Sequence, residues 1–340
     1  MIPDLVLNAF GLSDKAVITP TGSGHINKTF LVEDKSKYIL QRININVFKD
    51  PEAIATNNRI AADYLANHYP EFLFLTALRD KSGKDLVYAE DGFPWRLYPL
   101  IENTLTVDAL SSATEAYEAA VGFARLGKNL NDIDCKLFKP TLDRFQDLGW
   151  RYEQFEEALE IATPEAIAQA AEQIRQAKSF YFLVEEYKSL IASGSLKERI
   201  THNDTKINNI LFDKNTKKAV CVIDLDTLMP GYFIYDLGDM VRTCVSPVSE
   251  EEKDITKIAF RKEMYEAVVA GYLSEMSNFM SAEEKKAIPF AGKMMTYIMA
   301  LRFLADFLRG NTYYHITYLD QNLVRARNQL TFLSILCAHV

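Results

Sequence analysis

Three polar side chains in the middle of the sequence have the types and spacing that phosphoryl transfer to a hydroxyl group requires. Asp204 is followed five residues later by Asn209, and Asp224 follows the apolar run 219–223. The reaction needs a carboxylate that accepts the hydroxyl proton, and oxygen ligands that hold Mg²⁺ against nucleotide phosphates. Mg²⁺ prefers carboxylate, amide and water oxygens. Together the three residues supply both kinds of group.

A loop and a β-hairpin are predicted to carry these side chains. Residues 209–212 and 219–223 are short apolar runs, and the polar residues 213–218 form a turn between them. Asp204 then lies on the loop before the first strand, and Asp224 lies at the end of the second strand. The hairpin interrupts a chain segment that is otherwise predicted to be helical.

The chain before Glu102 is predicted to be mostly strand. Short β-rich runs bounded by turn residues predict strands over 16–19, 29–32, 37–40, 85–88 and 95–100. One helical pattern covers residues 51–66, and Pro51 suits its first turn. The hinge to the rest of the chain is expected at residues 101–106.

The chain after Glu102 is predicted to form long helices. Ser111 or Ser112 can cap a helix that runs to Leu126, and Thr163-Pro164 is a start signal for a helix to Gly194. Ser249 with Glu252, and Ser281 with Glu284, have the spacing of capping boxes. Further boundaries are a kink or restart at Pro289, a stop at Gly310 and a last helix over 320–336.

The central motif resembles that of the aminoglycoside phosphotransferase/choline kinase family, a branch of the protein-kinase-like fold. The matching residues are His202, Asp204, Asn209 and Asp224, followed by Asp236-Leu237-Gly238-Asp239. The resemblance covers most of the chain. It implies an α+β, bilobal fold, with a β-rich nucleotide-binding lobe at 1–102 and a mainly helical catalytic and substrate lobe at 103–340.

The resemblance also implies roles for the residues of this motif, with ATP and Mg²⁺ as cofactors. Asp204 is then the catalytic base, and Asn209 and Asp224 are the Mg²⁺ ligands. His202 either orients the catalytic loop or is a satisfied core histidine. Asp226 is either a second metal-shell carboxylate or a structural cap, and Asp236 is expected to hold the catalytic loop.

The nucleotide side is predicted from glycines and from the strands of the first lobe. Gly22-Ser23-Gly24 lies between two strands and could cradle phosphates through backbone N–H groups. Kinase-like folds place a phosphate-holding lysine on the third strand, but Gln41 stands there, with Arg42 beside it on the opposite face of a regular strand. Gln41 could make a neutral contact, a bulge could turn Arg42 inward, or a cation could come from elsewhere. Tyr98 and Leu100 align with the segment that meets adenine.

Within this family the chain most resembles the bacterial N-acetylhexosamine 1-kinases. The matching segments are 24–27, 38–44 with 47–48, 201–206, 223–227 with 230–231, and 301–304 with 306. The implied reaction is ATP-dependent phosphorylation of an anomeric hydroxyl. That hydroxyl is more acidic than an ordinary sugar alcohol, so a carboxylate base is adequate. Expected substrate residues are His25, Asn44, Arg242, Arg302, Asp306 and Tyr313, with an Arg302–Asp306 salt bridge as the alternative for that pair.

Two alternatives remain open, and the first of them shares every catalytic residue. The acceptor could be another small hydroxyl compound of the choline, aminoglycoside, homoserine or methylthioribose type. A cationic acceptor would require acidic or aromatic side chains around its positive charge. The chain could also bind nucleotide without catalysis, because Gln41 replaces the expected lysine. A protein kinase is disfavoured, because the H-R-D, D-F-G and A-P-E set is absent from the sequence.

Composition limits the partners. The chain has 340 residues, 48% of them hydrophobic, and a net charge of −8. This acidic balance disfavours nucleic acid and anionic membranes as partners. The four cysteines are widely spaced and fit buried thiols in a reducing compartment. We expect a cytoplasmic protein with a nucleotide and a small-molecule substrate as partners, and nothing indicates an obligate protein partner.

Overall fold

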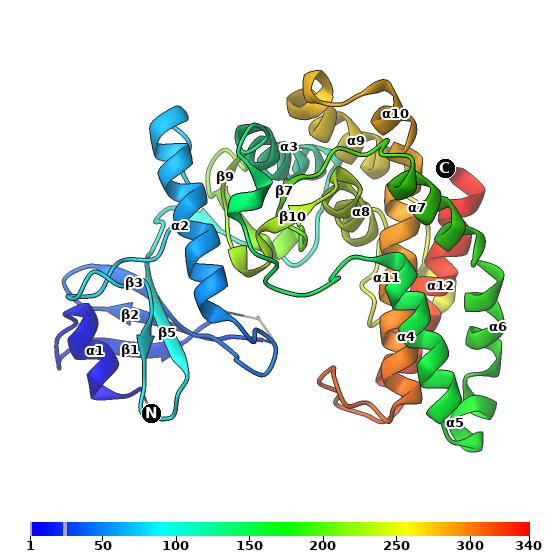
Figure 1. Cartoon of the computed structure of the whole chain (residues 1–340), viewed down its shortest axis with the longest axis horizontal. Coiled ribbons are helices and arrows are strands. Elements are labelled where there is room, and N and C mark those ends of the chain that lie inside the picture. The colour runs from blue at the N-terminus through cyan, green and yellow to red at the C-terminus, as the bar shows by residue number, and fades with distance from the viewer. Residues whose placement is uncertain (1, 23–25) are drawn as a thin grey trace.

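The computed structural model describes residues 2–22 and 26–340. It has a β-sheet part at the N-terminal end of the chain and a larger helical part after it (Figure 1). This arrangement confirms the predicted α+β class. Ser23, Gly24 and His25, which the sequence assigned to nucleotide or substrate binding, lie outside the described residues.

The N-terminal sheet is antiparallel, with the strand order β1-β2-β3-β5-β4. Its apolar face packs under α1 (Asp4–Phe10) through residues such as Leu40 and Trp95. On β3 the pairing is unbroken from Tyr38 to Arg42, so Gln41 lies directly opposite Arg96 of β5. The strands are β1 (Val17–Pro20), β2 (Lys28–Glu33), β3 (Lys37–Arg42), β4 (Val87–Tyr88) and β5 (Pro94–Pro99).

Helix α2 (Pro51–His68) lies between β3 and β4 in the sequence and contacts the larger helical part. Asp50 caps it by accepting the backbone N–H of Ala53, and Pro51 occupies the first turn as predicted. The buried Asn57 donates to the backbone oxygens of Lys139 and Leu228. One polar side chain of α2 therefore fixes the helix against two segments of the larger part.

The predicted hairpin is present between the helices. Strand β8 (Ile210–Asp213) pairs with β9 (Ala219–Val222) and with β6 (Thr104–Leu105). A second small sheet pairs β7 (Arg199–Thr201) with β10 (Met229–Gly231). Between these strands lie two short 3-10 turns, η2 (Ile207–Asn209) and η3 (Leu225–Thr227).

The helical part is built around α11 (Ile288–Leu308), which packs against α12, α8 and α4 and is buried along most of its length. The most buried large side chains of this core include Tyr297 and Phe303. The other helices are α3 (Ala113–Asn129), α4 (Leu148–Ile161), α5 (Pro164–Gln169), α6 (Ala171–Ser179), α7 (Phe182–Ala192), α8 (Phe233–Cys244), α9 (Lys262–Met276), α10 (Ala282–Lys286) and α12 (Gln321–His339).

Several predicted helix boundaries are confirmed. Ser112 caps α3, the Ser281–Glu284 capping box opens α10, and the chain restarts as α11 with Pro289 in its first turn. Gly310 follows the end of α11 with φ +83°. In the part of the chain that the model describes, no helix is both long and apolar enough to cross a membrane.

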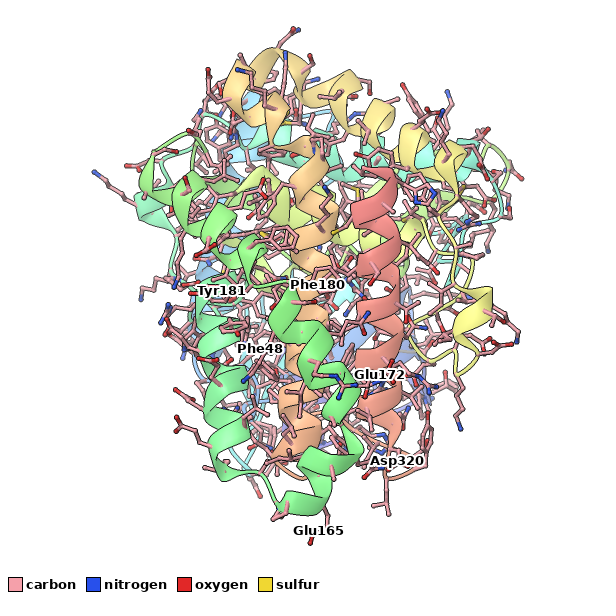
Figure 2. All side chains as sticks on the ribbon, turned by 90° about the vertical axis from the view of Figure 1, so that its right-hand side faces the viewer. Phe48, Glu165, Glu172, Phe180, Tyr181 and Asp320 are labelled. Carbon is pink, nitrogen blue, oxygen red and sulfur yellow. The ribbon has the colours of Figure 1, made fainter. Side chains whose placement is uncertain are left out.

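Two helix predictions are wrong. The single helix expected over 163–194 is divided into α5, α6 and α7. At the second break Phe180 packs against Tyr297 of α11, and Tyr181 packs against Tyr152 of α4, so the chain bends around these helices (Figure 2). Ser249 does not start a helix, because the residues after it form a turn instead. In that turn Glu251 pairs with Arg325 of α12.

Candidate active site

The catalytic loop predicted at residues 202–209 is held by one buried carboxylate. Asp236, near the start of α8, accepts the backbone N–H of His202 at 3.1 Å and that of Asn203 at 2.7 Å. Asn203 has φ +66°, and Asn is one of the few residues that adopt this left-handed conformation readily. Its side chain donates to the backbone oxygen of Thr227. The turn before Asp204 is therefore fixed from both sides.

Asp204 contacts two other polar side chains of this loop, Lys206 and Asn209. Its Oδ1 is 3.1 Å from the ammonium of Lys206, and its Oδ2 accepts from Asn209 Nδ2 at 3.1 Å. Burial alone would raise the pKa of Asp204, but the positive charge of Lys206 and its hydrogen bond to the carboxylate outweigh burial and lower that pKa. Asp204 is therefore ionised at neutral pH and can accept a hydrogen bond from a hydroxyl group.

His202 links the catalytic loop to the end of β9. Its Nδ1 accepts the backbone N–H of Asp204 at 3.2 Å, so Nε2 carries the hydrogen and donates to the Ile223 oxygen at 2.9 Å. The ring packs edge-on against Phe123. Both ring nitrogens are thus engaged, which favours the orienting role over proton transfer.

Asn209 and Asp224 are placed so that they could share a metal ion with a nucleotide. Asn209 donates through its nitrogen to Asp204, which leaves its side-chain oxygen for a ligand. Asp224 is exposed and has φ +58°. Protein atoms around its carboxylate displace part of the water, and this is the largest cause that raises its pKa to about 6. The negative charges of Asp226 and Asp204 are the next causes. A divalent cation would relieve this crowding of negative charge, so the residues fit Mg²⁺.

The protein side chains supply few ligands for a metal ion by themselves. Among residues 2–22 and 26–340, no three His, Cys, Asp or Glu side chains form a metal-binding group. Mg²⁺ is commonly held by one or two carboxylates together with substrate phosphates. The pair Asn209 and Asp224 is consistent with that pattern, and Mg²⁺ bound there would neutralise charge on the phosphoryl groups.

Asp226 is placed differently from the second metal ligand that the sequence allowed. It is buried, and both of its oxygens are engaged by the N-terminal part of the chain. Oδ1 pairs with the guanidinium of Arg96, and Oδ2 accepts from Asn27 Nδ2 at 2.7 Å. The carboxylate joins the metal-side loop to the sheet, so the structural alternative describes it better.

The nucleotide-side predictions have mixed outcomes. Arg42 pairs with Asp91 and stacks on Phe93, and β3 has no bulge, so Arg42 does not turn inward. Gln41 donates to Thr29 at 3.2 Å and accepts from Arg96. The sequence did not single out Arg96.

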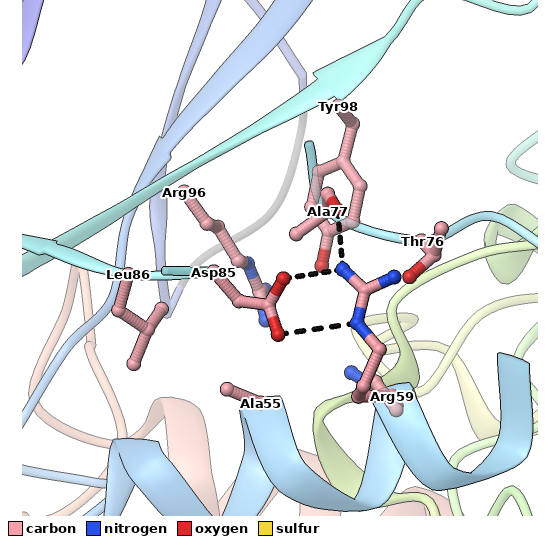
Figure 3. A pocket seen from close by; sticks show the side chains of 9 residues that line it. Ala55, Arg59, Thr76, Ala77, Asp85, Leu86, Arg96 and Tyr98 are labelled. Carbon is pink, nitrogen blue, oxygen red and sulfur yellow. Dashed lines mark hydrogen bonds and ion pairs between the residues drawn. The ribbon is translucent and has the colours of Figure 1, made fainter. Parts of the chain in front are cut away.

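The other two nucleotide-side residues differ in burial. The side chain of Tyr98 is buried beside a cavity of about 10 Å³, with Arg59, Asp85 and Arg96 (Figure 3). Leu100 is half-buried, and its backbone N–H donates to the oxygen of Lys37. The ring of Tyr98 therefore faces α2, and the backbone N–H of Leu100 is engaged by the sheet and not left for an adenine contact.

Three of the predicted substrate residues have structural partners. Asn44 accepts the N–H of Asn46 and so shapes a turn. Arg242 is buried between Asp239 and Glu250, and so does not point freely toward a substrate. Asp306 accepts the backbone N–H groups that follow α11 with both oxygens, so these oxygens are already engaged and Asp306 does not form the alternative salt bridge with Arg302.

Arg302 and Tyr313 do come together, in a cluster that the sequence only partly predicted. The Cζ of Arg302 lies 5.2 Å from the ring centroid of Phe145, 5.5 Å from Tyr314 and 5.9 Å from Tyr313. Burial, together with the charge of Arg302, lowers the pKa of Arg151 to about 9, so both guanidiniums remain charged at neutral pH. Phe145 and Arg151 come from other elements than α11 and leave no local sequence signal.

This cluster adjoins the catalytic loop. Gln146, next to Phe145, donates to the backbone oxygen of Asn203 at 2.8 Å, and Asn203 precedes the predicted base. Within the residues that the model describes, the Gln146 side-chain oxygen and the Tyr314 hydroxyl are buried without a hydrogen-bond partner. Buried polar atoms normally have a partner, so these two atoms mark this cluster as a candidate binding region.

Solved structures with the same fold extend over almost the whole chain. A microcompartment-associated aminopropanol kinase is 18% identical, with 98% of this chain and 94% of that chain covered and a TM-score of 0.59. An aminoglycoside phosphotransferase from Alicyclobacillus acidocaldarius is 14% identical, with 99% and 96% covered and a TM-score of 0.63. A Plasmodium vivax ethanolamine kinase is 14% identical, with 93% of this chain and 82% of that chain covered and a TM-score of 0.57.

The family comparison covers the sheet, the catalytic loop and most of the helical part. Residues 17–275 match the model of the phosphotransferase enzyme family, and this span includes Asp204, Asn209 and Asp224. That is most of the 340-residue chain. The chain therefore belongs to the phosphotransferase enzyme family.

Proposed function

We propose that the protein is an ATP- and Mg²⁺-dependent kinase that phosphorylates the anomeric hydroxyl of an N-acetylhexosamine or a related sugar. Asp204 accepts the hydroxyl proton and orients the attacking oxygen, while Asn209 and Asp224 hold the metal side. Lys206, 3.1 Å from Asp204, offsets negative charge beside the base. An ionised carboxylate suits the anomeric hydroxyl because that hydroxyl is comparatively acidic.

The arginine–aromatic cluster beside the catalytic loop carries the proposal for a sugar. Rings such as Tyr313 and Tyr314 provide an apolar wall, and Arg302 provides fixed donors for hydroxyl or acetamido oxygens. The unpartnered oxygen atoms of Gln146 and Tyr314 add further polar positions. A neutral, hydroxyl-rich acceptor uses all of these groups.

An amine-bearing acceptor fits this cluster less well. The aminopropanol and ethanolamine kinases with this fold act on amines, as their names state. In this chain a cationic acceptor would lie beside the positive charges of Arg302 and Arg151. Like charges at close range are costly in a partly buried site. The charge of the cluster therefore favours a sugar over an amino alcohol.

A panel of free sugars and amino alcohols, each with ATP and Mg²⁺, tests the proposal. The expected result is turnover with an N-acetylhexosamine, and phosphorus coupling to the anomeric carbon in the NMR spectrum of the product. Turnover restricted to amino alcohols or aminoglycosides would assign the alternative acceptor class. Nucleotide binding without turnover on any panel compound would support a non-catalytic protein.

A further inference from the structure

The third strand of the sheet lacks the phosphate-holding lysine, but a positive charge occupies nearly the same place. Gln41 stands at the lysine position, and its side-chain oxygen accepts two hydrogen bonds from Arg96, at 2.8 Å from Nη2 and 3.0 Å from Nε. A lysine side chain is only one bond longer than glutamine. The guanidinium of Arg96 therefore lies close to the position that the ammonium of a lysine at position 41 would reach.

The register of the sheet explains this exchange. Gln41 of β3 and Arg96 of β5 are direct partners, so their side chains project from the same face. Gln41 also donates to Thr29 of β2, which fixes its amide with the oxygen toward Arg96. The positive charge thus comes from the neighbouring strand β5 and lies close to the position that a lysine on β3 would reach.

The charge also faces the metal side of the site. Arg96 Nη1 pairs with Asp226, two residues after Asp224, and the side chain of Arg96 is only 3% exposed. Each terminal nitrogen of an arginine carries two hydrogens. One hydrogen on Nη1 and one on Nη2 therefore remain for a further acceptor, such as a phosphate oxygen.

We propose that Arg96 holds the phosphate groups of the nucleotide in place of the lysine that β3 lacks. The proposal rests on the proposed nucleotide-dependent function. Asp226 and Gln41 keep the guanidinium charged and oriented before the nucleotide binds, and Arg96 retains both contacts when phosphate oxygens take its remaining hydrogens. Arginine suits this role because its planar group can bind two acceptors on one side and still donate on the other.

Binding of ADP and adenosine, measured by displacement of a fluorescent nucleotide in EDTA, tests the proposal independently of turnover and metal. The doubly substituted chain Arg96→Met with Asp226→Asn avoids an unpaired buried charge. We expect ADP affinity to fall about tenfold or more, as the loss of a charge-assisted hydrogen bond predicts. Adenosine affinity is expected to stay within about threefold, because adenosine has no phosphate.

Three variants complete the experiment. Asp226→Asn alone measures what the lost ion pair contributes, and it should lower ADP affinity less than the double substitution does. Arg42→Met, which removes a neighbouring charge paired with Asp91, should leave ADP affinity unchanged. Gln41→Lys with Arg96→Gln and Asp226→Asn returns the cation to β3 and should recover most of the preference for ADP over adenosine.

Two results would overturn the inference. Equal loss of ADP and adenosine in the Arg96 variant would give this residue a structural role only, and unchanged ADP affinity would remove it from the phosphate site. Either result leaves the proposed function standing. By contrast, a wild-type chain that binds no ADP would contradict the nucleotide-dependent function itself.

Discussion

The carboxylate of Asp306 accepts the backbone N–H of Tyr313 at 2.8 Å, across the end of α11. The same carboxylate accepts from the backbone of Thr312 and Tyr314 and from the side chain of Asn322. Asp306 is buried, and it fixes the loop that presents Tyr313 and Tyr314 to Arg302. Its effect on an acceptor is therefore indirect, through the aromatic wall.

Replacing Asp306 with Ala should disorder this wall without touching the nucleotide side. Three backbone donors lose their acceptor, and each unsatisfied buried donor costs about 1–3 kcal/mol. We expect the KM for the acceptor to rise about tenfold or more and the KM for ATP to stay unchanged. Steady-state kinetics with each substrate varied in turn measures both. An equal rise in both KM values would mean that Asp306 supports the whole fold instead.

Arg302 is expected to bind the acceptor directly. Arg302→Ala removes the guanidinium that lies over Phe145 and Tyr314, so the KM for the sugar should rise about tenfold while kcat changes less. The matched control is Arg309→Ala, because Arg309 lies farther along the same helix end and contacts Gln154 and Glu157. An unchanged sugar KM in the Arg302 variant would remove this residue from the acceptor site.

The parts of the site that the sequence predicts are those encoded by local spacing. Asp204, Asn209 and Asp224 lie on one loop and one hairpin, so their separation along the chain nearly determines their arrangement. Arg96 contacts Asp226 across 130 residues. That contact depends on strand register and on how the two parts of the chain meet, and neither leaves a local pattern.

The errors in the fold have the same origin. The spacing of Ser249 and Glu252 satisfies the rule for a capping box, yet the neighbouring Glu251 binds Arg325 of α12 and the segment forms a turn. Asp306 has the spacing for a pair with Arg302, but backbone donors that follow the helix compete for it successfully. In both places tertiary contacts override a local preference.

Asp204 is expected to be indispensable for turnover but not for nucleotide binding. Asp204→Asn keeps the size of the side chain and removes the basic oxygen, so kcat should fall about a thousandfold, within the range for general base catalysis. ADP affinity should remain within about threefold, as isothermal titration would measure. Asp213→Asn, at the last residue of β8 where the side chain accepts from the turn that follows, is the control and should keep full activity. Retained turnover in the Asp204 variant would contradict its role as the base.

Lys206 should set the acid limb of the pH–rate profile. Its ammonium helps to lower the pKa of Asp204, and the base works only when that carboxylate is ionised. Without the ammonium in Lys206→Met, the pKa of Asp204 rises, and the rate should begin to fall at a higher pH than in the wild type. Lys206→Arg keeps the charge and should keep the limb in place. A profile of kcat/KM for the acceptor, extended down to about pH 3 so that it passes the usual pKa of an aspartate and run at saturating Mg²⁺ and ATP so that Asp224 stays ionised, measures the shift. An unmoved limb in Lys206→Met would show that Lys206 does not tune the base.

Gly238 should be required for the packing that supports the catalytic loop. It lies on α8 two residues after Asp236, and a Cβ at this position would come within 2.4 Å of the backbone oxygen of Ala291 on α11. Gly238→Ala should therefore lower the free energy of unfolding by about 1–3 kcal/mol, the usual cost of overpacking.

Gly127 on α3 is the control with the opposite expected effect, because the nearest atom to its added Cβ is Met276 Sδ at 3.9 Å. There Gly127→Ala should raise the free energy of unfolding by about 0.5–1 kcal/mol through helix propensity. Denaturant unfolding measures the change in the free energy of unfolding for both variants. A change of the same sign in both would contradict the close approach of α8 and α11 as the cause of the loss in Gly238→Ala.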